Sequence, residues 1–152
     1  MTNKIIISDT SCLLALDKIG LLLILSKLFP VIITTIVVEK EYGKPLPDWI
    51  TIQSVQNTGT QKELQEYLDA GEASAIALAL ETDNCVLIID EKTGRKVASR
   101  LHLEIAGTLQ VLLFAKTKGL IKSLSEVITQ LEQTNFYISE KLKEEVIKKA
   151  NE

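Results

Sequence analysis

Two runs of apolar residues predict strands that are buried on both faces. One run covers residues 5–7 and the other residues 85–89. Strands of a parallel sheet are apolar on both faces because helices cover both sides. Acidic residues follow each run, Asp9 after the first and Asp90-Glu91 after the second. Because parallel strands end at the same edge, both acids are expected in the crevice where open α/β sheets bind ligands.

Shorter patterns between and beyond these runs predict further strands and helices. Strands are expected over residues 31–34 and 103–105, and the alternation over 49–55 predicts a more exposed strand. Residues 60–63 and 123–126 each have the form of a capping box. Apolar spacing, caps and glycine or proline stops predict helices from residue 12, over 21–28, from 34 or 35 to 42, from 60 to about 69, over 71–80, 92–100 and 109–118, and from 123 and 139.

Strands that alternate with helices through most of the chain predict an α/β fold with a central parallel sheet between two helical layers, a three-layer α/β/α arrangement. The length of 152 residues favours one domain over residues 1–152. The helix over 71–80 is apolar on all sides, so it is expected to be buried between layers.

The composition is that of an ordinary globular protein, 46% hydrophobic and 24% charged. The longest apolar runs are too short to span a membrane, and no signal peptide is visible. Cys12 and Cys85 are far apart, with no C-x-x-C pair and no histidine cluster. They are typical of buried thiols in a reduced protein, so a cytoplasmic location is expected.

The net charge of −3 is unevenly distributed. Residues 92–122 hold seven basic residues and one acid, a local charge of +6 that leaves −9 elsewhere. A positive stretch on an acidic protein can bind a polyanion, although solvated helix faces also produce such runs.

Four acids have positions that could bring them to one site: Asp9, Glu41, Glu72 and Asp90. Each alone has a simpler interpretation, since Asp9 and Asp90 could be helix caps, Glu72 could complement a helix dipole, and Glu41 could be solvated. Carboxylates that converge repel one another unless a cation neutralises them. An all-oxygen ligand set in a chain with one histidine, His102, favours Mg²⁺ or Mn²⁺ over zinc.

Other reaction classes are less well supported. Catalysis by a Ser–His–Asp triad would depend on His102, which lies near the end of a basic helix. The glycine-rich nucleotide-binding motifs are absent from the sequence. An aspartyl phosphatase would have an acid two residues after Asp9, where Ser11 stands.

Taken in order, several short motifs resemble those of PIN-domain proteins. The resemblance is closest to small prokaryotic, often toxin-like members with a Gly-Thr-Leu segment. It rests on residues 7–11, on Val37-Val38 with Glu41-Tyr42-Gly43, on Gly71-Glu72-Ala73, on residues 88–91 with Arg95 and Ala98, on Gly107-Thr108-Leu109, and on Phe136-Tyr137-Ile138-Ser139.

This resemblance implies a Mg²⁺- or Mn²⁺-dependent endoribonuclease, the toxin of a toxin–antitoxin pair. The implied metal ligands and catalytic acids are Asp9, Glu41, Glu72 and Asp90, with Glu91 as a further ligand. The basic residues Lys92, Arg95, Lys96 and Arg100 are then expected to hold RNA phosphates. The implied partners are RNA, an antitoxin protein and a second copy of the chain, with no membrane.

Two departures from the family pattern affect the expected site. Gln110 stands where glycine is expected after Gly-Thr-Leu, and Glu39 competes with Glu41 as the second acid. Glu41 is preferred because it lies at the margin of the apolar face formed by Val37 and Val38, whereas Glu39 is rotated toward solvent.

Two rival interpretations keep the α/β fold. One is a catalytically weak PIN-like module that binds nucleic acid or a partner. The other is a receiver-like phospho-acceptor domain, which would have two adjacent acids after its first strand, where this chain has Asp9-Thr10.

Overall fold

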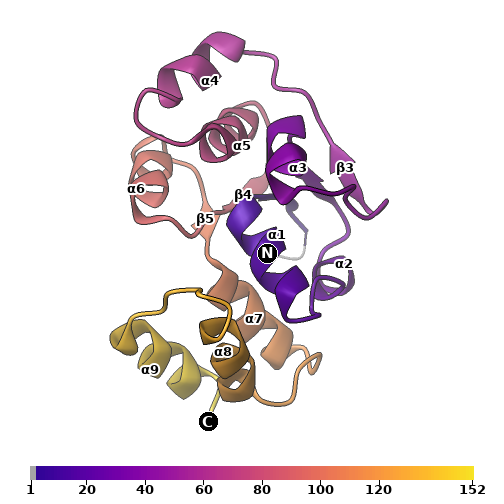
Figure 1. The fold of residues 1–152 in the computed structure, drawn as a ribbon, viewed down its shortest axis with the longest axis vertical. Helices are drawn as coiled ribbons and strands as arrows, with labels where there is room; N and C mark the ends of the chain where they lie inside the picture. Colours follow the sequence, from indigo (N-terminus) through magenta and orange to yellow (C-terminus); the bar gives the residue numbers. More distant parts are fainter. Residues whose placement is uncertain (1–2) are drawn as a thin grey trace.

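A computed structural model describes residues 3–152 and shows a five-stranded parallel sheet with helices on both faces (Figure 1). The three-layer α/β/α prediction is therefore confirmed. In chain order the elements are β1 (Ile5–Ser8), α1 (Thr10–Lys18), α2 (Ile24–Leu28), β2 (Ile32–Thr34), α3 (Ile36–Tyr42), β3 (Ile50–Ile52), α4 (Thr58–Leu64), α5 (Ala70–Leu80), β4 (Cys85–Ile88), α6 (Lys92–Arg100), β5 (Ile105–Ala106), α7 (Thr108–Thr117), α8 (Leu124–Glu132) and α9 (Glu140–Lys149).

The strand order is β3-β2-β1-β4-β5, which makes β1 the central strand. The register pairs Ile6 with Ile32 of β2 on one side and with Val86 of β4 on the other. From β1 the chain builds the sheet outward through β2 and β3, and then returns to the opposite side of β1 to form β4. The order of strands therefore reverses between β1 and β4, which is where open α/β sheets have their ligand crevice.

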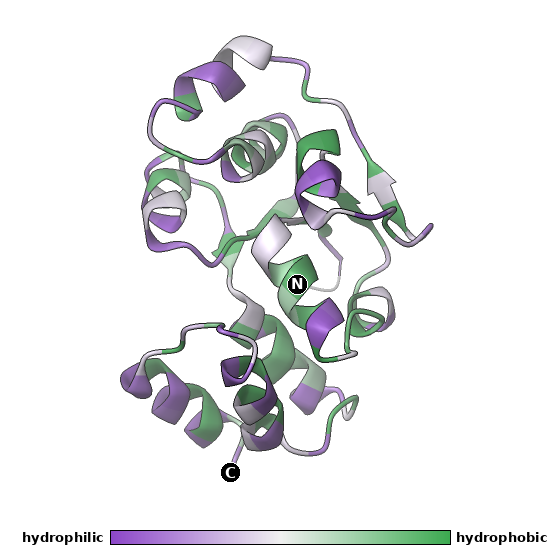
Figure 2. Ribbon diagram, in the orientation of Figure 1, coloured by the Kyte–Doolittle hydropathy of each residue, from purple (hydrophilic) through white to green (hydrophobic). Residues whose placement is uncertain are grey.

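The two faces of the sheet have separate apolar cores. Ile6 packs in one core with α1, α2, α7, α8 and α9, whereas its neighbour Ile7 packs in the other with α4, α5 and α6. Successive side chains of a strand point to opposite faces, so the isoleucine run fills both cores. The strands and α7 are mainly green in Figure 2, whereas α6 and α9 carry more purple. Within residues 3–152, no helix is both long enough and apolar enough to cross a membrane.

Several predicted boundaries are wrong, each for a local reason. The helix after residue 56 begins at Thr58, because Asn57 rather than Thr60 is its N-cap, and it ends at Leu64. The second helix begins at Ile24 because residues before it form a turn after Gly20 (φ +75°). The strand predicted over 49–55 is only three residues long, because only those residues pair with β2. The strand predicted over 103–105 lies later in the chain and has two residues, the two that pair with β4.

Candidate functional site

Asp9 lies at the carboxyl end of β1 and is the N-cap of α1. Its side chain is only 2% exposed, and Oδ1 accepts a hydrogen bond from the Cys12 backbone N–H at 2.9 Å. Oδ2 accepts a second bond from the Asp90 backbone N–H at 3.2 Å. The capping interpretation of Asp9 is thus correct, but the same carboxylate also joins the ends of β1 and β4.

Asp90 follows β4 and turns its carboxylate toward the start of α7. Oδ1 accepts from the Thr108 backbone N–H at 2.8 Å, and Oδ2 accepts from the Thr108 hydroxyl at 2.5 Å. A Cβ at Gly107 would lie 3.1 Å from Asp90 Oδ1, so the glycine lets the backbone approach the carboxylate closely. These bonds fix the orientation of Asp90 beside Asp9.

Glu72 lies in the first turn of α5 with its side chain 9% exposed. The helix is capped by Asp69, whose Oδ1 accepts from the Glu72 backbone N–H at 2.8 Å. A Cβ at Gly94 would lie 3.2 Å from Glu72 Oε2, so the Glu72 carboxylate faces the first turn of α6. That helix is capped by Glu91, whose Oε2 accepts from the Gly94 N–H at 2.9 Å. Glu72 and Glu91 therefore face the same turn.

Glu41 extends from α3 to α1 and α5. Its Oε1 accepts from the Thr10 hydroxyl at 2.6 Å, and its Oε2 accepts from the Gly71 N–H at 3.1 Å. A Cβ at Gly71 would lie only 2.0 Å from Glu41 Oε1. Glu41 therefore meets α1 beside Asp9 and α5 beside Glu72.

Glu39 points elsewhere, toward the loop after α3, where its Oε2 accepts from the Leu46 N–H at 3.4 Å. Its side chain is partly buried, so the expectation that it turns toward solvent is wrong. The structure thus brings Glu41, and not Glu39, alongside the residues that flank Asp9 and Glu72.

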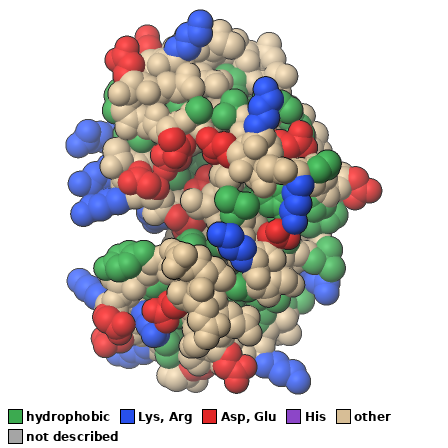
Figure 3. Space-filling view, viewed as in Figure 1, with side chains coloured by type: hydrophobic (Ala, Val, Ile, Leu, Met, Phe, Trp, Pro, Cys, Tyr) green, Lys and Arg blue, Asp and Glu red, His purple; other side chains and the backbone are tan. Residues whose placement is uncertain are grey.

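Burial makes the carboxylates of this cluster costly to ionise, and Arg95 is the one cation that offsets this cost at Asp90 among the residues that the structure describes. Burial raises the pKa of Asp9 well above its usual range, and the neighbouring Asp90 raises it further. Burial, together with Asp69 and Glu91, raises the pKa of Glu72 to about 7. Burial also raises the pKa of Asp90, against the bonds from Thr108 and the charge of Arg95. Acidic side chains gather in the middle of the face seen in Figure 3.

The oxygen-only donor set fits a hard divalent cation such as Mg²⁺ or Mn²⁺. Each carboxylate still has lone pairs that its hydrogen bonds do not use. In the part of the chain that the structure describes, no three acidic, histidine or cysteine side chains surround a point closely enough to form a ready ligand cluster. Asp9 lies beside Asp90, and Glu72 lies near Glu91. To hold an ion, these carboxylates would have to move closer together.

Basic side chains on α6 border the acidic cluster. Lys92, Lys96 and Arg100 are spaced four residues apart on an exposed face. Among residues 3–152, no carboxylate oxygen lies within 4.0 Å of any of their charged nitrogens. Arg95 differs from them because its Nη1 donates to the Ile89 carbonyl at 2.8 Å, next to Asp90. Of the four predicted RNA-binding residues, three are therefore free and one is engaged at the acidic site.

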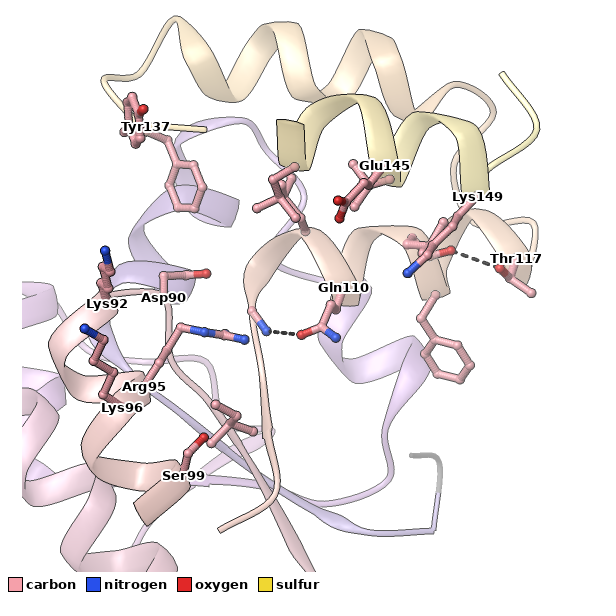
Figure 4. A pocket seen from close by; sticks show the side chains of 18 of the residues that line it. Asp90, Lys92, Arg95, Lys96, Ser99, Gln110, Thr117, Tyr137, Glu145 and Lys149 are labelled. Carbon is pink, nitrogen blue, oxygen red and sulfur yellow. Dashed lines mark hydrogen bonds between the residues drawn. The ribbon is translucent and has the colours of Figure 1, made fainter. Parts of the chain in front are cut away.

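Gln110, the departure from the family pattern, turns away from the acids. Its Oε1 accepts from the backbone N–H of Gly107, the N-cap of α7, at 2.8 Å (Figure 4). The side chain thus steadies the same turn that presents Thr108 to Asp90.

Sequence reasoning missed three residues that support the acids: Thr10, Asp69 and Thr108. Thr10 and Thr108 are the first residues of helices that follow strands, and each donates a hydroxyl to an acid. Asp69 was expected near the end of a helix, whereas it is the cap of the next one. The helix-start positions of the threonines were visible in the sequence, but their acidic partners, 31 and 18 residues away, were not.

If these acids hold the divalent ion of an RNA-cleaving site, as the sequence resemblance implies, Glu41→Gln should lower cleavage by at least about 100-fold, because losing one charged ligand removes several kcal/mol of charge stabilisation. Glu39→Gln is the matched control and should stay within about twofold of wild type, since its side chain lies at the other side of α3. Rates on one RNA substrate, with folding checked by circular dichroism, measure both. A larger loss from Glu39→Gln would show that the second acid is misassigned.

Comparison with known proteins gives one match. A family model described as a PIN domain covers residues 5–152, nearly the whole chain. No curated protein and no solved structure matches the chain significantly.

Proposed function

The chain belongs to the PIN-domain family, and from that premise we propose that it is a Mg²⁺- or Mn²⁺-dependent endoribonuclease. Membership of this family indicates a nuclease-type domain that acts on nucleic acid. The proposal of RNA as substrate and of a divalent ion as cofactor goes further, and it rests on the residues at the sheet edge.

One observation carries the proposal. Asp9 and Asp90 meet at the point where the strand order reverses, and Glu72 lies buried nearby. Burial raises the pKa of all three carboxyls, and the charges of Asp90 and Glu72 raise that of Asp9 further. A protein that needed these residues only for packing would gain stability from neutral side chains there. The arrangement is explained if a cation is part of the working site.

In the proposed mechanism, Asp9, Glu41, Glu72 and Asp90 would hold a divalent ion, with Glu91 at the margin. Such an ion, when bound, would supply activation of a water molecule and neutralisation of charge at the scissile phosphate. Thr108 and the Cys12 N–H orient Asp90 and Asp9, and Thr10 with the Gly71 N–H orients Glu41. The exposed cations of α6 hold the flanking phosphates of the strand.

The proposed function is tested by incubating the purified protein with a mixed RNA pool in Mn²⁺, in Mg²⁺ and in EDTA, beside a DNA pool of matched sequence. Cleavage of RNA with at least one metal and none in EDTA is expected. Intact RNA with both metals would support the rival interpretation, a PIN-like module with a weakened site.

The role of a toxin depends on the resemblance carried by Gly107-Thr108-Leu109 and belongs to the same proposal. It requires an antitoxin, which would be encoded by a small neighbouring gene. Co-expression of that gene product should abolish cleavage by the purified complex, and a neighbouring product that neither binds nor inhibits would contradict this role.

A prediction for RNA binding follows from the free cations of α6. Lys96→Ala should weaken binding of single-stranded RNA and reduce the slope of log affinity against log salt by about 0.7, the value for one phosphate contact. Arg95→Ala should weaken binding as well. It should also raise the pKa of Asp90, because the charge of Arg95 lowers that pKa in the wild type. Salt titrations followed by fluorescence anisotropy measure both.

The matched control is Lys27→Ala, an exposed lysine on α2, far from α6 (Figure 1). It should leave affinity and slope unchanged. If Lys96→Ala behaves like Lys27→Ala, the RNA does not run along α6.

A further inference from the structure

A groove of about 1080 Å³ leads away from Asp90 between α6 and the C-terminal helices. Its far wall consists of α7, α9 and the segment of residues 133–139 that joins α8 to α9. Figure 3 shows the molecule hollowed at its left edge, with basic side chains above the hollow and hydrophobic ones below. The mechanism proposed above uses only the α6 side of this groove.

The two walls of the groove differ in chemistry. The α6 wall is charged and presents Lys92, Lys96 and Arg100, with Asp90 at its inner end. The opposite wall is apolar and aromatic, and it includes Leu113, Phe114, Phe136, Tyr137 and Leu142. The residues that line the groove include five cations and two acids in all, so the groove carries a net charge of +3.

Tyr137 is the most exposed large side chain on the apolar wall, at 87%. Its neighbours hold it in place, because Ile138 is buried and Phe136 packs against the core. Thr134 donates its hydroxyl to the Leu131 carbonyl at 2.7 Å, and Ser139 caps α9, so both ends of the segment are fixed. In Figure 4 the Tyr137 ring lies at the mouth of the groove, on the wall opposite Lys92 and Lys96.

A charged wall that faces an aromatic wall matches the two sides of a single nucleic-acid strand. Phosphates bind to lysine and arginine, and unpaired bases stack on aromatic rings. A base pair within a duplex has both of its faces covered by neighbouring pairs, so it could not stack on this wall. An acidic protein segment would satisfy the cations but would leave the aromatic wall without a partner of matching shape.

We propose that Tyr137 stacks on an unpaired nucleobase of a strand whose phosphates lie along α6 and whose backbone reaches the acids at Asp90. This inference rests on the proposed function, since it names the form of nucleic acid that the same site receives. It assigns base recognition to the C-terminal segment and phosphate recognition to α6.

The test measures binding without metal, so that cleavage plays no part. Fluorescence anisotropy with a labelled, unstructured 15-nucleotide RNA in EDTA gives dissociation constants for wild type, Tyr137→Ala and Tyr137→Phe. Loss of one stacked base should raise the dissociation constant of Tyr137→Ala by about 5- to 100-fold, whereas Tyr137→Phe, which keeps the ring, should remain near wild type. Leu23→Ala is the control, because Leu23 is a large apolar side chain that is 55% exposed and lies outside the groove, next to α2.

Two further readouts separate stacking from a general loss of affinity. The salt slope of Tyr137→Ala should equal that of wild type, because no phosphate contact is removed. A strand of the same length built of abasic units should bind wild type and Tyr137→Ala equally. An unchanged dissociation constant for Tyr137→Ala, an effect that persists on the abasic strand, or no binding of the RNA by wild type would overturn the proposal.

The stacking proposal and the ribonuclease proposal can each fail without the other. Metal-dependent cleavage with normal binding by Tyr137→Ala would overturn the stacking role alone. Stacking with no cleavage in any metal would overturn the nuclease role alone.

Discussion

Asp9→Asn is expected to make the metal-free protein more stable at pH 8 and to remove its stabilisation by Mn²⁺. The wild-type carboxylate is buried beside Asp90, and both burial and that neighbour raise its pKa. Asparagine keeps an oxygen to cap α1 and carries no charge. Removing the charge should therefore stabilise the metal-free protein by more than the lost bond from the Asp90 N–H costs, and the Tm of the variant at pH 8 should exceed that of wild type.

The sign of this effect should depend on pH. A carboxyl whose pKa is raised by folding binds protons more readily in the folded state, so stability falls as pH rises between the unfolded and folded values. For Glu72 that window extends from 4.5 to about 7, and Asp9 contributes in the same direction. As pH falls, the folded wild-type Asp9 takes up its proton more readily than the unfolded chain does, and against the protonated form the variant lacks only the bond from the Asp90 N–H. The advantage of Asp9→Asn should therefore vanish or reverse.

Thermal unfolding at pH 4 and pH 8, in EDTA and in Mn²⁺, measures these differences. Saturation at 100 times the dissociation constant would stabilise wild type by about 2.7 kcal/mol, and the variant should respond far less. A variant that is less stable than wild type at pH 8 in EDTA, or equally stabilised by Mn²⁺, would refute this interpretation of Asp9.

Gly71→Ala is expected to lower cleavage on the order of 100-fold while leaving the fold intact. The added Cβ would lie 2.0 Å from Glu41 Oε1 and 2.7 Å from Glu41 Cδ, so the carboxylate must move away. The move breaks its bond to the Gly71 N–H, and a displacement of about 1 Å at a catalytic group can cost about 100-fold. Stability should not fall, because Glu41 is exposed and alanine favours the helix by up to about 1 kcal/mol.

Gly59→Ala is the control for the same substitution in a helix. Its Cβ would make an ordinary 3.4 Å contact with Asn57 and would touch none of the acids. Activity assays and thermal unfolding on both variants separate the effects. Full activity in Gly71→Ala would mean that the position of the Glu41 carboxylate does not matter for the reaction.

The sheet and its acidic edge could be predicted because they depend on local patterns. Ile6 and Ile7 show that β1 is buried on both faces, and Asp9 and Asp90 follow strands directly. Parallel strands bring such residues to one edge whatever the connections are. The cap at Asn57 and the two-residue β5 were harder to predict, because competing caps and pairing partners decide those boundaries.

The contacts that orient the acids could not be predicted from the sequence. The bond from Thr108 to Asp90 and the approach of Gly71 to Glu41 join segments 18 and 30 residues apart. Their formation depends on how α7 and α5 pack on the sheet, which no local pattern specifies. The groove beside Tyr137 depends in the same way on the placement of the C-terminal helices.

The rate of RNA cleavage by wild type and by Asp9→Asn, measured side by side in Mn²⁺, tests the central claim most directly. Both proteins should be folded and should bind the RNA, because Asp9 holds no phosphate in the proposed arrangement. The wild type should cleave, its activity should stop on addition of EDTA, and the variant should be slower by at least about 100-fold. Equal rates for the two proteins, or wild-type cleavage that persists in EDTA, would contradict a metal-dependent reaction at this edge of the sheet.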